Sequence, residues 1–334
     1  MAVTLKEVAD RAGVSRSAVS RTFTEGASVS AKMRKKVEKA AAELRYSPNA
    51  LASSLTTGRT KLIGLVANNF QNPIFLEVFD LYTQALQERG LRPLIVNLTH
   101  ETDPANSVQM LNQYSVDGVI VATSTLPPNF ATAFKQAQIP VVHTFGRVSG
   151  TSSVHIVGID NNVCGRMAAQ TLIDYGYRRI AFLGGPKSAT SAQDRAEGFM
   201  GCLSENGITP VDVRYADGYA YQAGRKAMGE LMRKTRADAI FCGDDLICMG
   251  AMDEARGAGL RIPDDIGFIG FNDMTMSEWA AYDLTTVHQP TSDIIRSSIE
   301  LVASLVNEPD RSIENRIFAC TVVERGTLKR QSTG

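Results

Sequence analysis

The first 45 residues place apolar side chains three and four positions apart, a spacing that puts them on one face of a helix. One such face lies near the amino end, at Leu5, Val8, Ala9 and Ala12. A second face follows at Val37, Ala40, Ala41 and Leu44. Gly13 ends the first pattern, and Ser15 and Ser30 stand where a side chain can cap the next helix. The pattern predicts three short helices, of which the first two are joined by a glycine-containing turn typical of helix-turn-helix domains.

The second of these helices runs from about residue 16 to Phe23 and leaves its polar side chains on the outside. We assign its apolar residues, Val19 and Phe23, to the core of the head. The outward face then carries two arginines and two serines: Arg16, Ser17, Ser20 and Arg21. Arginine can bind guanine through two hydrogen bonds in the major groove, which is worth roughly 1–3 kcal/mol of discrimination. The pattern favours a DNA recognition helix, and the alternative is a structural three-helix bundle with solvated arginines.

The stretch that follows the three helices predicts a further helix too short to be stable alone. It opens with Ser47-Pro48, and Thr-Thr-Gly follows within about two turns. Leu51 and Leu55 lie four residues apart and are exposed unless another surface covers them. A linker that pairs with its copy in a dimer and inserts Leu55 between base steps would use this pattern. An ordinary interdomain linker is the alternative.

From Lys61 onward, short apolar runs alternate with helical patterns. The runs expected to form strands lie at 62–67, 93–97, 119–122, 141–144, 180–184, 239–242, 266–270 and 318–323. Helices are expected at about 74–89, 104–114 and 292–306, and after Asp160-Asn161. Strands that alternate with helices form parallel sheets covered on both faces. The two series predict two doubly wound subdomains, with a ligand cleft between them at the carboxyl ends of the strands.

Composition changes this picture through the distribution of charge. The chain has 334 residues, with 35 basic and 35 acidic side chains. Residues 1–60 nevertheless carry eleven basic and five acidic side chains, so the helical head is basic and the remainder of the chain is acidic. A small basic module on a larger acidic body indicates a head that binds a polyanion.

Other features exclude several kinds of function. No apolar run approaches the roughly 18–20 residues of a membrane span, and the amino end lacks a signal-peptide pattern. The five cysteines form no CxxC pair and the four histidines are isolated, so we expect buried free thiols in the cytoplasm and no metal site. Neither a dinucleotide nor a nucleoside-triphosphate motif occurs, and no catalytic constellation is evident. We therefore expect a binding protein without a cofactor rather than an enzyme.

A longer string within residues 3–60 has a characteristic order. It comprises Thr4-Leu5, Val8-Ala9, Ala12-Gly13-Val14-Ser15, Val19-Ser20-Arg21, Val29-Ser30, Arg34, Val37, Tyr46, Pro48-Asn49, Ala52 and Leu55. This string resembles the DNA-binding head of the lactose-repressor (LacI/GalR) family of bacterial regulators. The resemblance implies a homodimer on a near-palindromic operator in double-stranded DNA. It also implies a set of DNA-contacting residues: Thr4, Ser15, Arg16, Ser17, Ser20, Arg21, Ser30, Arg34, Asn49, Ala52 and Leu55.

The resemblance assigns particular roles to four residues of this set. Arg16 and Ser17 fall at the family's variable base-reading positions, Arg21 falls at a common one, and Leu55 falls at the minor-groove wedge. Hydroxyl groups at the predicted helix starts suit phosphate oxygens.

The resemblance extends to the acidic body, which is similar to a periplasmic-binding-protein-like domain. Phe75 would offer an aromatic face to a ligand, and Arg195 matches the family's effector-binding arginine. Tyr219 falls where the family often has an aromatic residue that stacks on a sugar ring. The alternatives are an ion pair for Arg195 and simple packing for Tyr219.

Two short stretches depart from the family pattern. The usual Ala-Asn-Asp is Gly-Asp-Asp at 243–245, and the usual Gly-Tyr/Phe-Asp-Asp is Gly-Phe-Asn-Asp at 270–273. We infer that an acidic acceptor has moved across the pocket, with Asp244 and Asn272 both lining it. A carboxylate beside Arg195 suits hydroxyl groups, which both donate and accept, and this favours a sugar-like or polyol effector. Trp279 lies in a loop that either caps the pocket or packs.

The sequence thus predicts an all-α helix-turn-helix head and an α/β body. The expected boundaries are 1–46 for the head, 47–60 for a hinge helix and linker, and 61–334 for the ligand-binding and dimerisation domain. The body divides into subdomains of about 61–160 plus 291–318 and 161–290 plus 319–330.

The expected function is that of a cytoplasmic, homodimeric repressor whose operator affinity is controlled by a small sugar or polyol. The alternative within the family is a corepressor-dependent repressor or an activator that responds to a non-sugar metabolite. A sugar-binding receptor would need a signal peptide and no head, and a sugar-processing enzyme would need an acid/base pair.

Overall fold

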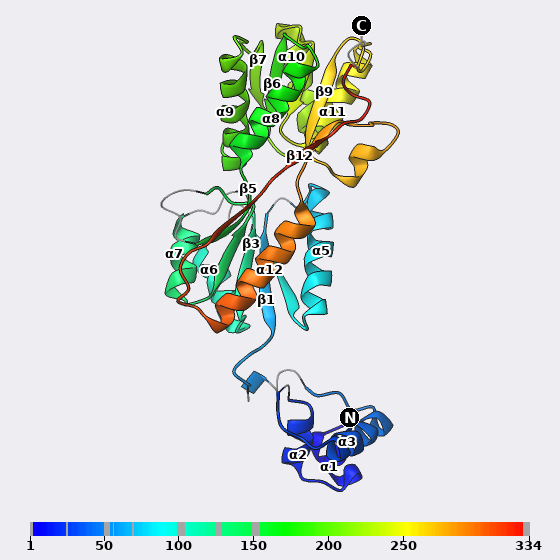
Figure 1. The fold of residues 1–334 in the computed structure, drawn as a ribbon, viewed down its shortest axis with the longest axis vertical. Coiled ribbons are helices and arrows are strands. Elements are labelled where there is room, and N and C mark those ends of the chain that lie inside the picture. The colour runs from blue at the N-terminus through cyan, green and yellow to red at the C-terminus, as the bar shows by residue number, and fades with distance from the viewer. Residues whose placement is uncertain are drawn as a thin grey trace. The chain divides into compact units, whose positions relative to one another are not determined.

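The computed structural model divides into two compact units, Met1–Lys61 and Leu62–Gly334, which we call the head and the body. The structure describes residues 3–24, 26–49, 54–55, 57–68, 70–98, 104–124, 128–148 and 154–329. Figure 1 traces the chain through both units. The predicted architecture of a helical head and a two-subdomain α/β body is confirmed.

The head contains three helices whose starts are fixed by side-chain caps. They are α1 (Leu5–Ala12), α2 (Arg16–Thr22) and α3 (Ala31–Leu44). The hydroxyls of Thr4, Ser15 and Ser30 each accept a hydrogen bond from a backbone N–H of the helix that follows. Gly13 ends α1 in the left-handed conformation, with φ of 61°. These side-chain caps therefore determine where the three short helices begin.

The small core of the head is built from one apolar face of each helix. Val8, Val19 and Val37 are fully buried in it. The assignment of Phe23 to the core was wrong: this residue, at the C-cap of α2, is 36% exposed, and its ring lies 5.9 Å from that of Tyr46. Phe23 therefore covers the edge of the core rather than filling its centre.

The linker is described only in part. Residues 47–49 have no regular structure, and residues 54, 55 and 57 are helical. Ala52, which the resemblance assigns to DNA contact, and Leu51, predicted to be exposed unless covered, fall outside the described residues.

The first subdomain of the body is a parallel sheet of six strands in the order β11-β5-β4-β3-β1-β2. The strands are β1 (Leu62–Ala67), β2 (Arg92–Asn97), β3 (Gly118–Ala122), β4 (Val141–Thr144), β5 (His155–Ile159) and β11 (Asn315–Phe318). The helices are α5 (Ile74–Glu88), α6 (Pro104–Gln113), α7 (Pro128–Gln136) and α12 (Thr291–Asn307). Helices α5 and α12 pack together on one face of the sheet, and α6 and α7 cover the other (Figure 1).

The second subdomain has a six-stranded sheet in the order β12-β10-β9-β8-β6-β7. Its strands are β6 (Ile180–Gly184), β7 (Asp212–Tyr215), β8 (Ala239–Cys242), β9 (Gly267–Asn272), β10 (Thr286–His288) and β12 (Thr321–Val323). Only β12 runs antiparallel to its neighbour. The helices are α8 (Asn161–Asp174), α9 (Thr190–Glu205), α10 (Tyr221–Lys234), α11 (Asp245–Gly257) and the 3₁₀ turn η1 (Thr275–Glu278).

The chain crosses between the subdomains three times, at Asp160, at Gln289-Pro290 and at Ala319-Cys320. The predicted single strand over 318–323 is therefore wrong, because the third crossing divides it into the end of β11 and the whole of β12. Strand β5, which the sequence pattern did not identify, lies directly before the first crossing.

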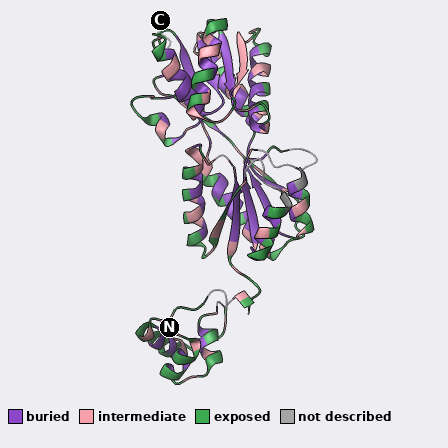
Figure 2. Cartoon of the chain, turned by 180° about the vertical axis from the view of Figure 1, so that it is seen from behind, coloured by how far each residue is buried: buried purple, intermediate pink, exposed green. Residues whose placement is uncertain are grey.

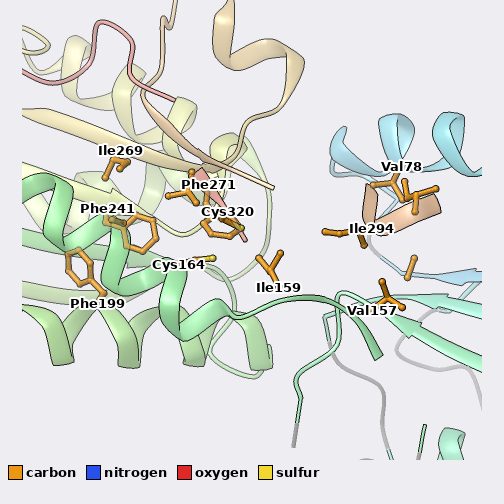
Figure 3. Packing of buried hydrophobic residues seen from close by; sticks show 14 of the residues in the cluster. Val78, Val157, Ile159, Cys164, Phe199, Phe241, Ile269, Phe271, Ile294 and Cys320 are labelled. Carbon is orange, nitrogen blue, oxygen red and sulfur yellow. The ribbon is translucent and has the colours of Figure 1, made fainter. Parts of the chain in front are cut away.

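The inner strands of both sheets are buried on both faces, as expected for sheets covered by helices (Figure 2). The edge strands β2, β7, β11 and β12 are partly exposed. One cluster of buried residues continues from Phe199 and Phe241 in the second subdomain to Val78 and Ile294 in the first (Figure 3). The two subdomains therefore share apolar packing at their junction.

Candidate nucleic-acid interface and effector cleft

The outward face of α2 presents the side chains that the sequence assigned to base recognition. Arg16, Ser17, Ser20 and Arg21 are all exposed. Within the described residues, neither Arg16 nor Arg21 makes an ion pair or a side-chain hydrogen bond. Both guanidinium groups are therefore available to a partner outside the head.

A hydroxyl-lined hollow of about 250 Å³ lies between α2 and the start of α3. Its lining includes four serines and one of the recognition arginines: Ser15, Ser17, Ser28, Ser30 and Arg21. Hydroxyls and a guanidinium are the groups that contact phosphate oxygens in protein–DNA complexes. The hollow therefore suits a backbone phosphate beside the base-reading face.

The other predicted DNA-contacting residues differ in exposure and in the contacts that they already make within the head. Thr4 is exposed, and its hydroxyl and backbone N–H take part in a capping box with Glu7. Arg34 is half-buried and donates through Nη1 to the carbonyl of Thr22 at 2.9 Å, so it ties α3 to the end of α2. Asn49 is exposed, and Leu55 is 90% exposed.

Arg195 is held in a fixed position by contacts within the second subdomain. It lies on α9 and is 7% exposed. Its Nε donates to Asn161 Oδ1 at 2.8 Å, and its Nη1 donates to the Gly243 carbonyl at 2.6 Å. The guanidinium lies 3.4 Å from the centroid of the Phe271 ring. Burial lowers the pKa of Arg195, and nearby acidic groups, Tyr219 and Asp244 among them, oppose this shift.

Asp244 accepts four hydrogen bonds from the protein itself. Its Oδ1 accepts from the backbone N–H groups of Leu246 and Ile247 at 2.9 and 3.2 Å, so it caps α11. Its Oδ2 accepts from Nδ2 of Asn72 and from Nδ2 of Asn272, both at 3.0 Å. Asp244 is 2% exposed, and a ligand hydroxyl reaches it only by displacing one of these donors.

Burial is also the main electrostatic influence on this carboxylate. It raises the pKa of Asp244 to about 6, and the neighbouring charge of Asp245 acts in the same direction. The hydrogen bond from Asn72 and the charge of Arg195 oppose the rise without cancelling it.

The end of β9 has an unusual backbone that side-chain contacts hold in place. Asn272 and Asp273 have positive φ values of 122° and 58°, which are uncommon for residues other than glycine. Asn272 Oδ1 accepts from Gln289 Nε2 at 2.6 Å, and Asp273 accepts from Arg325 and His288 at 2.7 and 3.0 Å. Such strain persists where surrounding contacts over-determine it, and it is common at binding sites.

The two predicted aromatic residues lie on opposite subdomains. Phe75 is half-buried on α5, with its ring 6.2 Å from that of Phe79. Tyr219 lies in the second subdomain, and its hydroxyl is 3.4 Å from Ser191 Oγ. A Cβ at Gly185 would lie 2.2 Å from the Tyr219 ring. The ring can therefore occupy this position only because residue 185 has no side chain. Burial raises the pKa of Tyr219, which keeps the hydroxyl protonated.

The structure therefore brings four of the predicted residues close together in the second subdomain: Arg195, Tyr219, Asp244 and Asn272. Sequence reasoning missed three polar residues that orient this group: Asn72, Asn161 and Gln289. Their place in the chain could have identified two of them, because Asn161 and Gln289 lie next to the points where the chain crosses between the subdomains.

Two absences complete the description of the site. In the described ranges, no helix is long and apolar enough to span a membrane. The same residues contain no group of three histidine, cysteine or carboxylate side chains that could hold a metal ion.

A helix-turn-helix head with exposed arginines and a body with a buried polar cluster indicate a DNA-binding regulator with a candidate small-molecule site. The comparisons with known proteins agree. Residues 4–49 match the bacterial regulatory proteins of the lacI family, and residues 169–328 match a periplasmic binding protein-like domain.

Curated relatives match along nearly the whole chain. The HTH-type transcriptional repressor PurR of Proteus mirabilis is 33% identical, with 96% of this chain and 93% of the relative covered. The HTH-type transcriptional regulator DegA of Bacillus subtilis is 32% identical, with 88% of each covered. The protein belongs to the lacI family and is a DNA-binding transcriptional regulator rather than an enzyme.

Solved structures support the same assignment. The Lac repressor dimer bound to operator and the anti-inducer ONPF is 26% identical, with a TM-score of 0.87 over 98% of this chain and 99% of that chain. A complex of the transcriptional regulator CelR with cellobiose is 28% identical, with a TM-score of 0.74 over 97% of this chain and 99% of that one.

Proposed function

We propose that this protein is a cytoplasmic repressor that binds a near-palindromic operator as a homodimer and changes its operator affinity when a small effector occupies the body. The observation that carries the proposal is the exposed face of α2, with two arginines that have no partner in the described part of the head. The relatives named as repressors and the operator-bound Lac repressor dimer support it.

Within the head, we assign direct base contacts to Arg16, Ser17 and Arg21, which are exposed along one helix. The serine-lined hollow receives a phosphate and fixes the register of the helix on the duplex. Leu55 acts as the minor-groove wedge, because its almost complete exposure leaves it free to enter a base step. Arg34 has a supporting role, since it holds the ends of α2 and α3 together.

Selection of bound duplexes from a random DNA pool tests the operator proposal. We expect the full-length protein to enrich a near-palindrome with a fixed central step. Arg16→Ala should relax preference at one position of each half-site and cost about 1–3 kcal/mol there. Lys32→Ala, at an exposed position at the start of α3, is the matched control and should weaken all sequences equally. Equal weakening by both variants would remove Arg16 from base reading.

We propose a sugar-like or polyol effector for the cleft, anchored on Arg195. Within the described residues no acceptor pairs with Nη2 of Arg195, so this donor is available to an oxygen of the ligand. Asp244 is already engaged by four donors, so the effector's hydroxyls exchange with Asn72 or Asn272 when they bind there. The CelR–cellobiose complex supports a sugar, whereas a non-sugar metabolite is the alternative.

Isothermal titration calorimetry with a panel of neutral sugars, polyols, sugar acids, nucleobases and sugar phosphates tests the ligand class. Heat with a neutral sugar or polyol supports the proposal. Binding by only sugar acids, phosphates or nucleobases overturns the sugar assignment and leaves the DNA-binding assignment intact. Repeating the DNA-binding assay with the ligand that binds then decides between induction and corepression.

A further inference from the structure

The two subdomains of the body are joined by contacts of the protein's own polar side chains. One contact is buried, from Asn72 before α5 to Asp244 before α11. A second lies nearby, where Glu77 Oε1 on α5 accepts from the backbone N–H of Thr275 at 3.0 Å. Both contacts pair a residue of the first subdomain with a residue of the second.

A third contact lies on a different pair of elements and is ionic. Arg147, which follows β4 in the first subdomain, donates to both carboxylate oxygens of Asp194 on α9, at 2.8 and 2.5 Å. Its Nη2 also donates to the Thr190 carbonyl and to Gln193 Oε1, both at 3.1 Å. Two parallel hydrogen bonds from the planar guanidinium to one carboxylate fix the orientation of both groups. The side chains are 39% and 17% exposed, so solvent screens the pair only in part.

The sequence places this ion pair next to the effector-binding arginine. Asp194 and Arg195 are consecutive on α9, so Asp194 contacts the first subdomain while Arg195 contacts Asn161 and Gly243. Any separation of the subdomains must break the Arg147–Asp194 pair. A ligand that moves Arg195 also moves the helix that carries Asp194.

We propose that Arg147 and Asn72 are positioning residues that latch the cleft shut, through Asp194 and Asp244 respectively. The effector then acts by shifting the balance between the latched and the unlatched body, a step that rests on the proposed function. The latch itself is a property of the body alone, and it can be measured without DNA or effector.

Hydrogen–deuterium exchange of the full-length protein provides the test. The reporter is the amide of Thr275, which is held by Glu77 and belongs to neither proposed latch. Arg147→Gln should raise exchange in the peptide that carries Thr275 about fivefold, the effect expected from loss of roughly 1 kcal/mol of ion-pair energy. The charge-swapped pair Arg147→Asp with Asp194→Arg should restore protection.

A second variant, Asn72→Asp, tests the buried contact between Asn72 and Asp244. Asn72→Asp retains the oxygen that accepts from the Ile74 N–H, but it replaces the amide donor that faces Asp244 with an acceptor. It should therefore expose the Thr275 amide as Arg147→Gln does, while the turn before α5 remains formed.

The control is Arg166→Gln, which breaks a similarly forked pair with Glu205 inside the second subdomain. The two arginines are about equally exposed, and Glu205 is more exposed than Asp194. Arg166→Gln should leave exchange at Thr275 unchanged. The proposal is overturned if Arg147→Gln alters exchange only in its own loop and α9, or if Arg166→Gln produces the same change at Thr275. Neither result bears on operator binding, so failure of the latch is distinct from failure of the proposed function.

Discussion

Replacing Asp244 with asparagine should change how the stability of the body depends on pH. Asp244→Asn removes a buried charge and keeps the size of the side chain. It also leaves an amide among the four donors that bind the native carboxylate, or forces Asn72 or Asn272 to turn. That mismatch involves no titrating group, so it shifts the free energy of unfolding by the same amount at every pH. Only the loss of the carboxyl group changes how the free energy of unfolding depends on pH.

The magnitude follows from the pKa of the carboxyl group. Burial raises the pKa of Asp244 from 3.8 to about 6, which amounts to about 3 kcal/mol at about 1.4 kcal/mol per pKa unit. Because the folded state binds the proton more tightly, this stabilisation is complete below the unfolded pKa and is lost as pH rises through the folded pKa. Between pH 4.5 and 7.5 the loss is about 2 kcal/mol.

Urea unfolding followed by tryptophan fluorescence can measure this difference. The chain has one tryptophan, Trp279, which lies in the body, so its emission reports on the body rather than the head. We expect the free energy of unfolding of the native protein to fall, relative to that of Asp244→Asn, by about 2 kcal/mol from pH 4.5 to 7.5.

Asp265 supplies the control for this experiment. Arg261 lowers its pKa to about 2, so both its folded and unfolded pKa values lie below the pH range used. Asp265→Asn should therefore give a curve parallel to that of the native protein. Parallel curves for Asp244→Asn as well would refute the argument that Asp244 is a buried, ionised carboxylate with a raised pKa.

Three other substitutions give separate expectations. Leu55→Ala should leave the thermal midpoint unchanged, because the side chain is 90% exposed, and should weaken operator binding in a fluorescence-anisotropy titration. Arg195→Gln should abolish the heat of effector binding while the ligand-free protein still binds the selected operator; loss of both would indicate unfolding instead. Gly198→Ala should lower the urea midpoint of the body by the equivalent of about 1–3 kcal/mol, because its Cβ would lie 1.9 Å from the Asn162 carbonyl. Gly257→Ala, whose Cβ meets nothing within 4 Å, should not.

The sequence predicts the head well because its determinants are local. Thr4, Ser15 and Ser30 cap the helices that begin one residue later, and such caps depend on neighbouring backbone groups alone. Most strands of the body are predictable as apolar runs for a similar reason, whereas the pattern does not identify β5, β7 or β10. The run at 318–323 misled the prediction because an apolar pattern does not show that successive residues enter different sheets.

The candidate site is less predictable because its contacts are distant in sequence. The family resemblance identifies Arg195, and the departure from the family pattern identifies Asp244. One of the two amides that donate to Asp244, however, comes from Asn72, 172 residues away. Arg34 shows the same limit on a smaller scale, since the resemblance assigns it to DNA contact and its guanidinium already donates to the Thr22 carbonyl. Residue type indicates what a side chain can bind, whereas tertiary structure decides which partner already occupies it.

The three crossings of the body also determine the order in which the protein can fold during synthesis. The core of the head is complete within the first 49 residues, so it can form soon after it leaves the ribosome. Each sheet of the body, in contrast, lacks an edge strand until residues 315–318 and 321–323 have been made. Ribosomes that stop before these residues would therefore release chains with a folded DNA-binding head and an incomplete regulatory body. Such chains should be good substrates for proteases, which would remove heads that no effector could control.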